Sequence, residues 1–141
     1  MPKLIIVGVD GNEPAAEAAK VAADLARDTN AGLHVVCAFG RDEVAEIELD
    51  GAQKTRVSIA EESADIAART AASLGAGIEH VSSAAAQGRP AEVLVAEAER
   101  LGATLIVIGN KRVQGPGRLL GSVAASVAHH APCDVYIAHT T

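Results

Sequence analysis

The sequence predicts an α/β fold in which a parallel sheet of five strands carries helices on both faces. Two observations lead to this class. Short β-branched segments alternate with longer segments that have helical periodicity, an order typical of parallel strands joined by right-handed crossovers. The core must also be aliphatic, because 49% of the 141 residues are hydrophobic but only 1% are aromatic. We expect residues 1–141 to form a single domain.

Each element is predicted from its own pattern. Five short segments are rich in β-branched residues, as strands are: Lys3–Val9, Leu33–Phe39, Ile78–Ala85, Thr104–Gly109 and Asp134–His139. Four segments between them show helical spacing of apolar residues: Glu13–Asp28, Ala52–Leu74, Pro90–Leu101 and Ser122–His130. The fourth strand is apolar on both faces, as a central parallel strand requires. Pro14 and Pro90 fit first helical turns, where a missing N–H costs little.

The common arrangement of five such strands is the order 3-2-1-4-5, which reverses direction between the first and fourth strands. Ligands of open α/β sheets lie beyond the carboxyl ends of the strands at this reversal. The first strand ends at Val9 and Asp10, and the fourth ends at Gly109. These two strand ends therefore predict one ligand crevice.

A glycine-rich basic loop follows the fourth strand and closes with Gly121 and Ser122, where a helix that includes Val123 begins. The loop carries Lys111, Arg112, Gly115, Gly117 and Arg118. Glycines let the backbone approach an anion, and the free N–H groups and dipole of a helix start favour negative charge. The pattern indicates a ligand that bears phosphate.

Two residues of the predicted crevice have alternative roles. Asp10 could hold a ribose hydroxyl or, through a metal ion, a phosphate; it could also be a helix cap or turn residue beside Gly11 and Asn12. Ser122 could donate to a phosphate oxygen and could also cap its own helix.

The acidic loop from Gly40 to Gly51 is either a surface loop or a lid over the ligand.

Composition excludes several classes of function. A net charge of −6 and a near-absence of aromatic residues argue against nucleic-acid binding. No apolar stretch approaches the roughly 20 residues that cross a bilayer, and no signal peptide precedes the first strand, so we expect a cytoplasmic protein without membrane contact. Cys37 and Cys133 are expected to be reduced core residues.

The histidines suggest no catalytic or metal site. His129 and His130 fall near the end of the last helix, where cations suit the dipole, and the remaining three are scattered over three strands: His34, His80 and His139. No zinc-like spacing occurs, and no Cys/His or Ser/His/Asp constellation is apparent. We therefore expect structural histidines, no metal site and no catalytic residues.

The sequence resembles the universal stress protein family over essentially its whole length. Four segments carry the resemblance: Val7-Gly-Val-Asp10-Gly11 with the following helix; Gly88-Arg-Pro90; Ala103-Thr-Leu-Ile-Val-Ile-Gly109; and Leu120-Gly-Ser-Val123 through Ala131-Pro-Cys-Asp-Val135. The ending also looks like actinobacterial members, some of which bind cyclic AMP. The resemblance implies a Rossmann-like domain of the adenine nucleotide alpha hydrolase-like type and a homodimer.

The resemblance also implies binding of ATP or cyclic AMP, with Mg²⁺ as a companion of ATP. Many members bind ATP through a Gly-x2-Gly-x9-Gly-Ser/Thr signature, whose first glycine is Gly109 here and whose closing pair is Gly121 and Ser122. The family's acidic residue at the first strand end corresponds to Asp10. Its adenine contact at the second strand end falls near Ala38.

The signature is altered at one position. Arg112 replaces the second glycine, and only eight residues separate it from Gly121. Arg112 either obstructs the phosphates, because glycine allows close backbone approach there, or contributes forked donors to them in a refolded loop. Removing its side chain strengthens ATP binding in the first case and weakens it in the second.

Three functions fit these features. The first is a nucleotide-binding protein of stress response or signalling, and the second is a dimeric stress protein that acts through protein contacts without a nucleotide. The third is a nucleotide hydrolase. Because the sequence has neither a P-loop lysine with its Ser/Thr nor a clear general base, we expect at most slow ATP hydrolysis.

Overall fold

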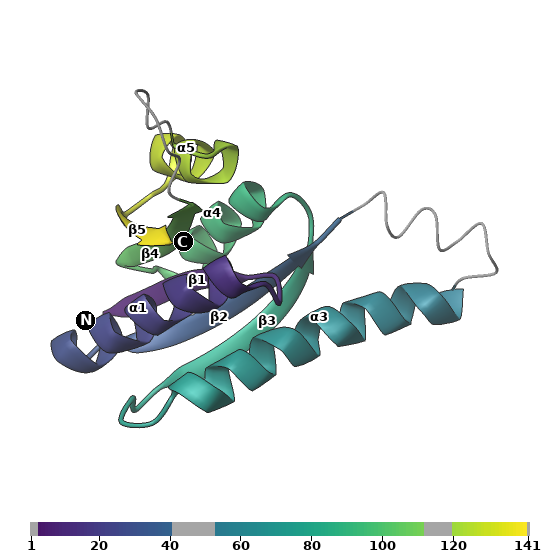
Figure 1. Cartoon of the computed structure of the whole chain (residues 1–141), viewed down its shortest axis with the longest axis horizontal. Helices are drawn as coiled ribbons and strands as arrows, with labels where there is room; N and C mark the ends of the chain where they lie inside the picture. The colour runs from purple at the N-terminus through teal and green to yellow at the C-terminus, as the bar shows by residue number, and fades with distance from the viewer. Residues whose placement is uncertain (1–2, 41–52, 112–119, 141) are drawn as a thin grey trace.

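The structure, a computed structural model of the chain, describes residues 3–40, 53–111 and 120–140; of residues 53–58 and 111 it describes the backbone alone. The predicted fold class and strand order are confirmed. Five parallel strands form one sheet in the order β3-β2-β1-β4-β5 (Figure 1). The strands are β1 (Leu4–Val9), β2 (Gly32–Phe39), β3 (Val81–Gln87), β4 (Leu105–Lys111) and β5 (Asp134–Thr140). The helices are α1 (Glu13–Thr29), α3 (Gln53–Leu74), α4 (Pro90–Leu101) and α5 (Ser122–His130).

Strand β1 lies at the centre of the sheet and pairs with β2 on one side and with β4 on the other. Ile6 is in register with His34 of β2 and with Ile106 of β4. The direction in which the strands succeed one another therefore reverses between β1 and β4, as the sequence predicted. The carboxyl ends of these two strands lie side by side at one end of the sheet.

The predicted bounds of α4 and α5 agree with the structure, and most other bounds differ by one or two residues. The largest error is the start of the third strand, predicted at Ile78 and observed at Val81. A turn from Gly75 to Ile78 comes directly before the segment between these two positions, because the N–H of Ile78 donates to the carbonyl of Gly75 at 3.0 Å and Gly77 has a φ of +80°, and the strand begins only three residues after the turn. β-branched composition alone could not separate this turn from the strand.

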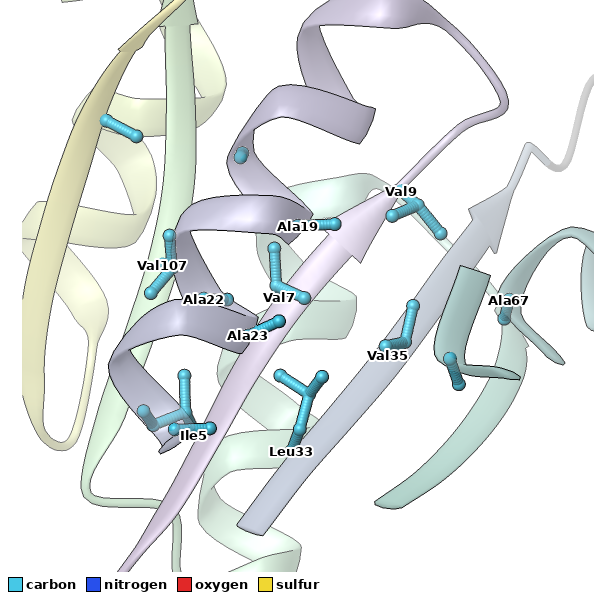
Figure 2. Close-up of a cluster of buried hydrophobic side chains, with 14 of the residues drawn as sticks. Ile5, Val7, Val9, Ala19, Ala22, Ala23, Leu33, Val35, Ala67 and Val107 are labelled. Carbon is cyan, nitrogen blue, oxygen red and sulfur yellow. The ribbon is translucent and has the colours of Figure 1, made fainter. Parts of the chain in front are cut away.

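Two apolar cores cover the two faces of the sheet. On one face, small alanines of α1 and α3 pack against valines, isoleucine and leucine of β1, β2 and β4 (Figure 2). On the other face, α4 and α5 pack against the same three strands and against β5. Alanine side chains allow a helix to approach the sheet closely, which explains how a core with so few aromatic residues is filled. In the part of the chain that the structure describes, no helix has the length and apolar character needed to cross a membrane.

Candidate functional site

A cavity of about 300 Å³ opens at the carboxyl ends of β1, β2 and β4, across the point where strand order reverses. The first turns of α1 and α4 and the start of α5 complete its wall. Its lining residues are Gly8, Val9, Asp10, Pro14, Ala15, Val36, Ala38, Pro90, Val93, Leu94, Ile108, Gly109, Val123 and Thr140. The wall is mainly apolar, with Asp10 as its carboxylate, and this composition suits a flat ring system with a few polar groups.

The structure brings together five of the residues predicted for the crevice: Val9, Asp10, Ala38, Gly109 and Val123. Gly121 and Ser122 lie at the start of α5, next to Val123. Lys111 ends β4, and its backbone alone is described. Four predicted residues lie outside the described part of the chain: Arg112, Gly115, Gly117 and Arg118. Residues 41–51 of the acidic loop also lie outside it.

Asp10 lies at the rim of the cavity and also organises the turn into α1. Its Oδ1 accepts a hydrogen bond from the backbone N–H of Asn12 at 2.8 Å. Gly11, between them, has a φ of +85°, a conformation that other residues rarely adopt. The turn role considered for Asp10 is therefore present. The side chain is exposed, and a carboxylate has acceptor sites beyond the one used here, so the same residue can face a ligand hydroxyl.

The start of α5 bears on Ser122, for which two roles were considered. Gly121 is the N-cap residue, with an extended backbone and no side-chain cap, so of these two roles the structure does not show the helix cap. The backbone N–H of Gly121 instead donates to Oδ1 of Asn110 at 2.7 Å. Asn110 thereby ties the end of β4 to the start of α5. Helix geometry leaves the next amides, those of Ser122 and Val123, without intrahelical acceptors.

Gly109 has a packing role beside its place in the cavity wall. A Cβ atom at this position would lie 3.2 Å from Cβ of Ala18, 3.3 Å from the carbonyl oxygen of Pro14 and 3.3 Å from Cγ2 of Thr140. Glycine therefore lets the end of β4 approach both α1 and β5. The family signature assigns this glycine to the phosphate-binding motif. The close packing seen here is a second reason for a glycine at this position.

Sequence reasoning missed most of the apolar wall: Gly8, Pro14, Ala15, Val36, Pro90, Val93, Leu94, Ile108 and Thr140. Pro14 and Pro90 were interpreted only as helix starts. Their positions immediately after strand ends were a usable signal, because the first turns of crossover helices border the crevice of such a sheet. Thr140 gave no signal; its Oγ1 is buried and has no hydrogen-bond partner among the described residues.

The two cysteines are protonated thiols at neutral pH, because burial raises the pKa of each. Burial raises the pKa of the Cys37 thiol, a hydrogen bond from Ser63 opposes that rise, and the nearby charge of Asp10 adds to it. Cys37 and Cys133 are both free, as expected. Within the described ranges no group of three His, Cys, Asp or Glu side chains could hold a metal ion.

The sheet order, the helices on both faces and the cavity at the reversal define a Rossmann-like α/β domain. The sequence profile of the universal stress protein family matches residues 1–139. The chain therefore belongs to the universal stress protein family. The universal stress protein Rv1636 of Mycobacterium tuberculosis is 34% identical over 146 aligned positions, which cover 99% of this chain and 97% of the relative. A universal stress protein of Thermus aquaticus is also 34% identical, over 97% of this chain and 98% of its own.

Solved structures agree with this assignment. The crystal structure of a universal stress protein in complex with cAMP matches with a TM-score of 0.67 and 30% identity, covering 99% of this chain and 98% of the other. The protein MJ0577 matches with a TM-score of 0.79, covering 100% and 98% of the two chains. At 21% identity that second likeness shows the shared fold alone.

Proposed function

We propose that this chain binds an adenine nucleotide, ATP or cyclic AMP, in the cavity at the ends of β1 and β4. The observation that carries the proposal is the position of the cavity. It lies at the strand-order reversal, it includes residues predicted independently from both strand ends, and a relative 30% identical to this chain was solved with cAMP.

The lining supports a division of roles within the proposed site. The apolar wall of Val36, Ala38 and Leu94 suits the adenine ring. The Asp10 carboxylate suits a ribose hydroxyl. The amides at the start of α5, with the basic loop before it, suit the phosphate, since a helix N-terminus attracts anions. Mg²⁺ would accompany ATP.

The proposal extends to the assembly and its setting. We infer a cytoplasmic homodimer, paired through β5, that serves in stress response or signalling through its nucleotide. One observation favours the alternative of a dimeric stress protein that binds no nucleotide. Asn110 already satisfies the N–H of Gly121, so a phosphate at that amide would have to displace a side chain.

The substitution Gly121→Asp tests the site. We expect the variant to fold, because Gly121 has a φ of −60° and Asp is a favoured N-cap residue. Its carboxylate would place negative charge among the amides assigned to the phosphate, so ATP and cyclic AMP should bind at least about tenfold more weakly, a change of about 1.4 kcal/mol. Isothermal titration calorimetry on the intact protein measures this effect.

The matched control is Gly121→Asn, which has the same size and capping ability without the charge. We expect it to retain more affinity than Gly121→Asp. Unchanged nucleotide affinity in Gly121→Asp would contradict the phosphate assignment. A wild-type protein that binds neither ATP nor cyclic AMP would favour the alternative function.

A further inference from the structure

Four hydrogen-bonded side chains, of which His34 and Glu97 are largely buried, lie on the face of the sheet covered by α4, apart from the cavity at the ends of β1 and β4. Nδ1 of His34, on β2, lies 2.6 Å from Oγ of Ser82, on β3. Nε2 of His34 lies 2.8 Å from Oε2 of Glu97, on α4. Arg100, one turn further along α4, donates from Nε and Nη2 to the two oxygens of Glu97, each at 2.9 Å. Three elements thus place a serine, a histidine and a carboxylate in series.

The hydrogen bonds determine which nitrogen of His34 carries the proton. Arg100 above all, together with His34, holds the pKa of Glu97 below its usual value against the opposing effect of burial. Glu97 is therefore a carboxylate at neutral pH and accepts the N–H of Nε2. In neutral His34, Nδ1 then carries a lone pair and accepts the hydroxyl proton of Ser82. This is the resting arrangement of a serine nucleophile, its general base and the group that orients the base.

A serine nucleophile must be accessible to its substrate, whereas its general base can be buried, and the exposure of Ser82 and His34 differs in this way. His34 is 4% exposed, whereas Ser82 is exposed on a strand at the edge of the described sheet. Along an edge strand, alternate backbone N–H groups face away from the neighbouring strand. The main chain of β3 can therefore supply a donor for a developing oxyanion.

A hollow with room for an acyl group lies near these residues, at the amino ends of β2 and β3. The hollow, of about 580 Å³, is lined by Gly32, His80 and Leu101, among others. Gly32 lies two residues before His34 in β2, and His80, which immediately precedes β3, lies two residues before Ser82. Leu101 lies one helical turn after Glu97. The hollow therefore lies two residues along each strand, and one helical turn along α4, from Ser82, His34 and Glu97, which do not themselves line it.

We propose that Ser82, His34 and Glu97 form a nucleophilic site for small carboxylic esters, distinct from the nucleotide cavity. Oγ of Ser82 attacks the ester carbonyl carbon while its proton passes to Nδ1 of His34, and the carbonyl π electrons move to oxygen. Collapse of the oxyanion breaks the ester C–O bond, and the leaving alkoxide takes the proton from Nδ1. Water then attacks the acyl-serine by the same proton route and releases the carboxylic acid and free Ser82.

A fluorophosphonate probe and p-nitrophenyl acetate test this proposal on the full chain. Peptide mapping by mass spectrometry should find the phosphonate adduct on Ser82, and Ser82→Ala should lose both the adduct and ester turnover. Ser83 is the matched control, because it is also exposed on β3, but the hydrogen bond of His34 Nδ1 is made with Ser82. Ser83→Ala should retain labelling at the wild-type rate. An unlabelled Ser82, or equal labelling of Ser82 and Ser83, would overturn the proposal.

Variants of the histidine and glutamate test the mechanism beyond simple exposure of a serine. His34→Gln should lower the labelling rate at Ser82 by about 100-fold or more, the range for loss of a general base. Glu97→Gln should lower the maximal labelling rate while leaving the probe concentration for half-maximal rate unchanged, as expected of a positioning residue. Circular dichroism verifies folding; should His34→Gln not fold, the comparison of Ser82 with Ser83 in the wild type decides. Unchanged labelling in a folded His34→Gln variant would contradict the proposal.

Discussion

At the scale of single residues, two glycines in the cavity wall differ in what surrounds them. A Cβ atom at Gly109 would lie within 3.3 Å of the Pro14 carbonyl oxygen, Cβ of Ala18 and Cγ2 of Thr140. At Gly8 the three nearest atoms to such a Cβ all belong to the Leu94 side chain, with its two terminal methyl groups at 3.3 Å. A backbone carbonyl and two short side chains cannot move aside easily, whereas the end of a leucine can change rotamer.

We therefore expect Gly109→Ala to destabilise the fold by about 1–3 kcal/mol, the usual range for overpacking a core. Gly8→Ala should be less destabilising because Leu94 can adjust. Urea unfolding of the two variants beside the wild type measures the difference in free energy of unfolding. Equal losses in both variants would contradict the packing role assigned to Gly109.

The sequence predicted those residues of the site that lie at strand ends or that are glycines. Val9, Asp10 and Gly109 were found because the strand order identifies which strand ends meet. The Ser82–His34–Glu97 chain was not found, because its members come from three elements and no sequence spacing relates them. The register of β2 with β3, which pairs His34 with Ser82, is what brings two of them together.

At the scale of elements, the same chain attaches α4 to the sheet by polar contacts as well as apolar ones. Glu97 is mostly buried, with 13% of its side chain exposed, and it contacts His34 of β2. The helix also packs Val93, Leu94 and Ala98 into the core of that face. Helical periodicity predicted the bounds of α4 correctly. Glu97 interrupts the apolar pattern on the inner face of this helix, and only its contact with His34 of β2 explains its position.

The lowered pKa of Glu97 makes the stability of the fold depend on pH. The pKa of Glu97 is lowered in the folded protein. Such a carboxylate stabilises the fold at pH values above the pKa that it has in the unfolded chain, which is about 4.3 for glutamate. That stabilisation is lost as the pH falls through the lower folded-state pKa. We expect Glu97→Gln to reduce the difference in unfolding free energy between neutral pH and acidic pH, as measured by urea unfolding.

Glu99→Gln controls for the loss of one carboxylate, because Glu99 is exposed on the same helix. A Glu97→Gln variant whose stability falls with acidity as steeply as that of the wild type would show that the contact with Arg100 and His34 does not stabilise the fold.

At the scale of the whole molecule, the strand order leaves β3 and β5 at the two edges of the described sheet (Figure 1). The order itself was predictable, because alternation of strands and helices together with right-handed crossovers leaves few arrangements. The alternation of strands and helices does not predict whether an edge strand pairs with a strand of another chain. Strand β5 presents Tyr136 with 45% of its surface exposed, and an exposed apolar edge is prone to pair with another chain.

We expect the protein to be a dimer at micromolar concentration, with β5 of each chain meeting its copy. Tyr136 lies near the middle of β5, so in a two-fold pairing centred on this strand its two copies lie close together. Tyr136→Glu would then bring two like charges together and should shift the population towards monomer. Light scattering coupled to size-exclusion chromatography measures the mass. Leu120→Glu is the matched control, because Leu120 is 44% exposed and lies outside β5. A wild-type monomer, or equal dissociation by both variants, would contradict pairing through β5.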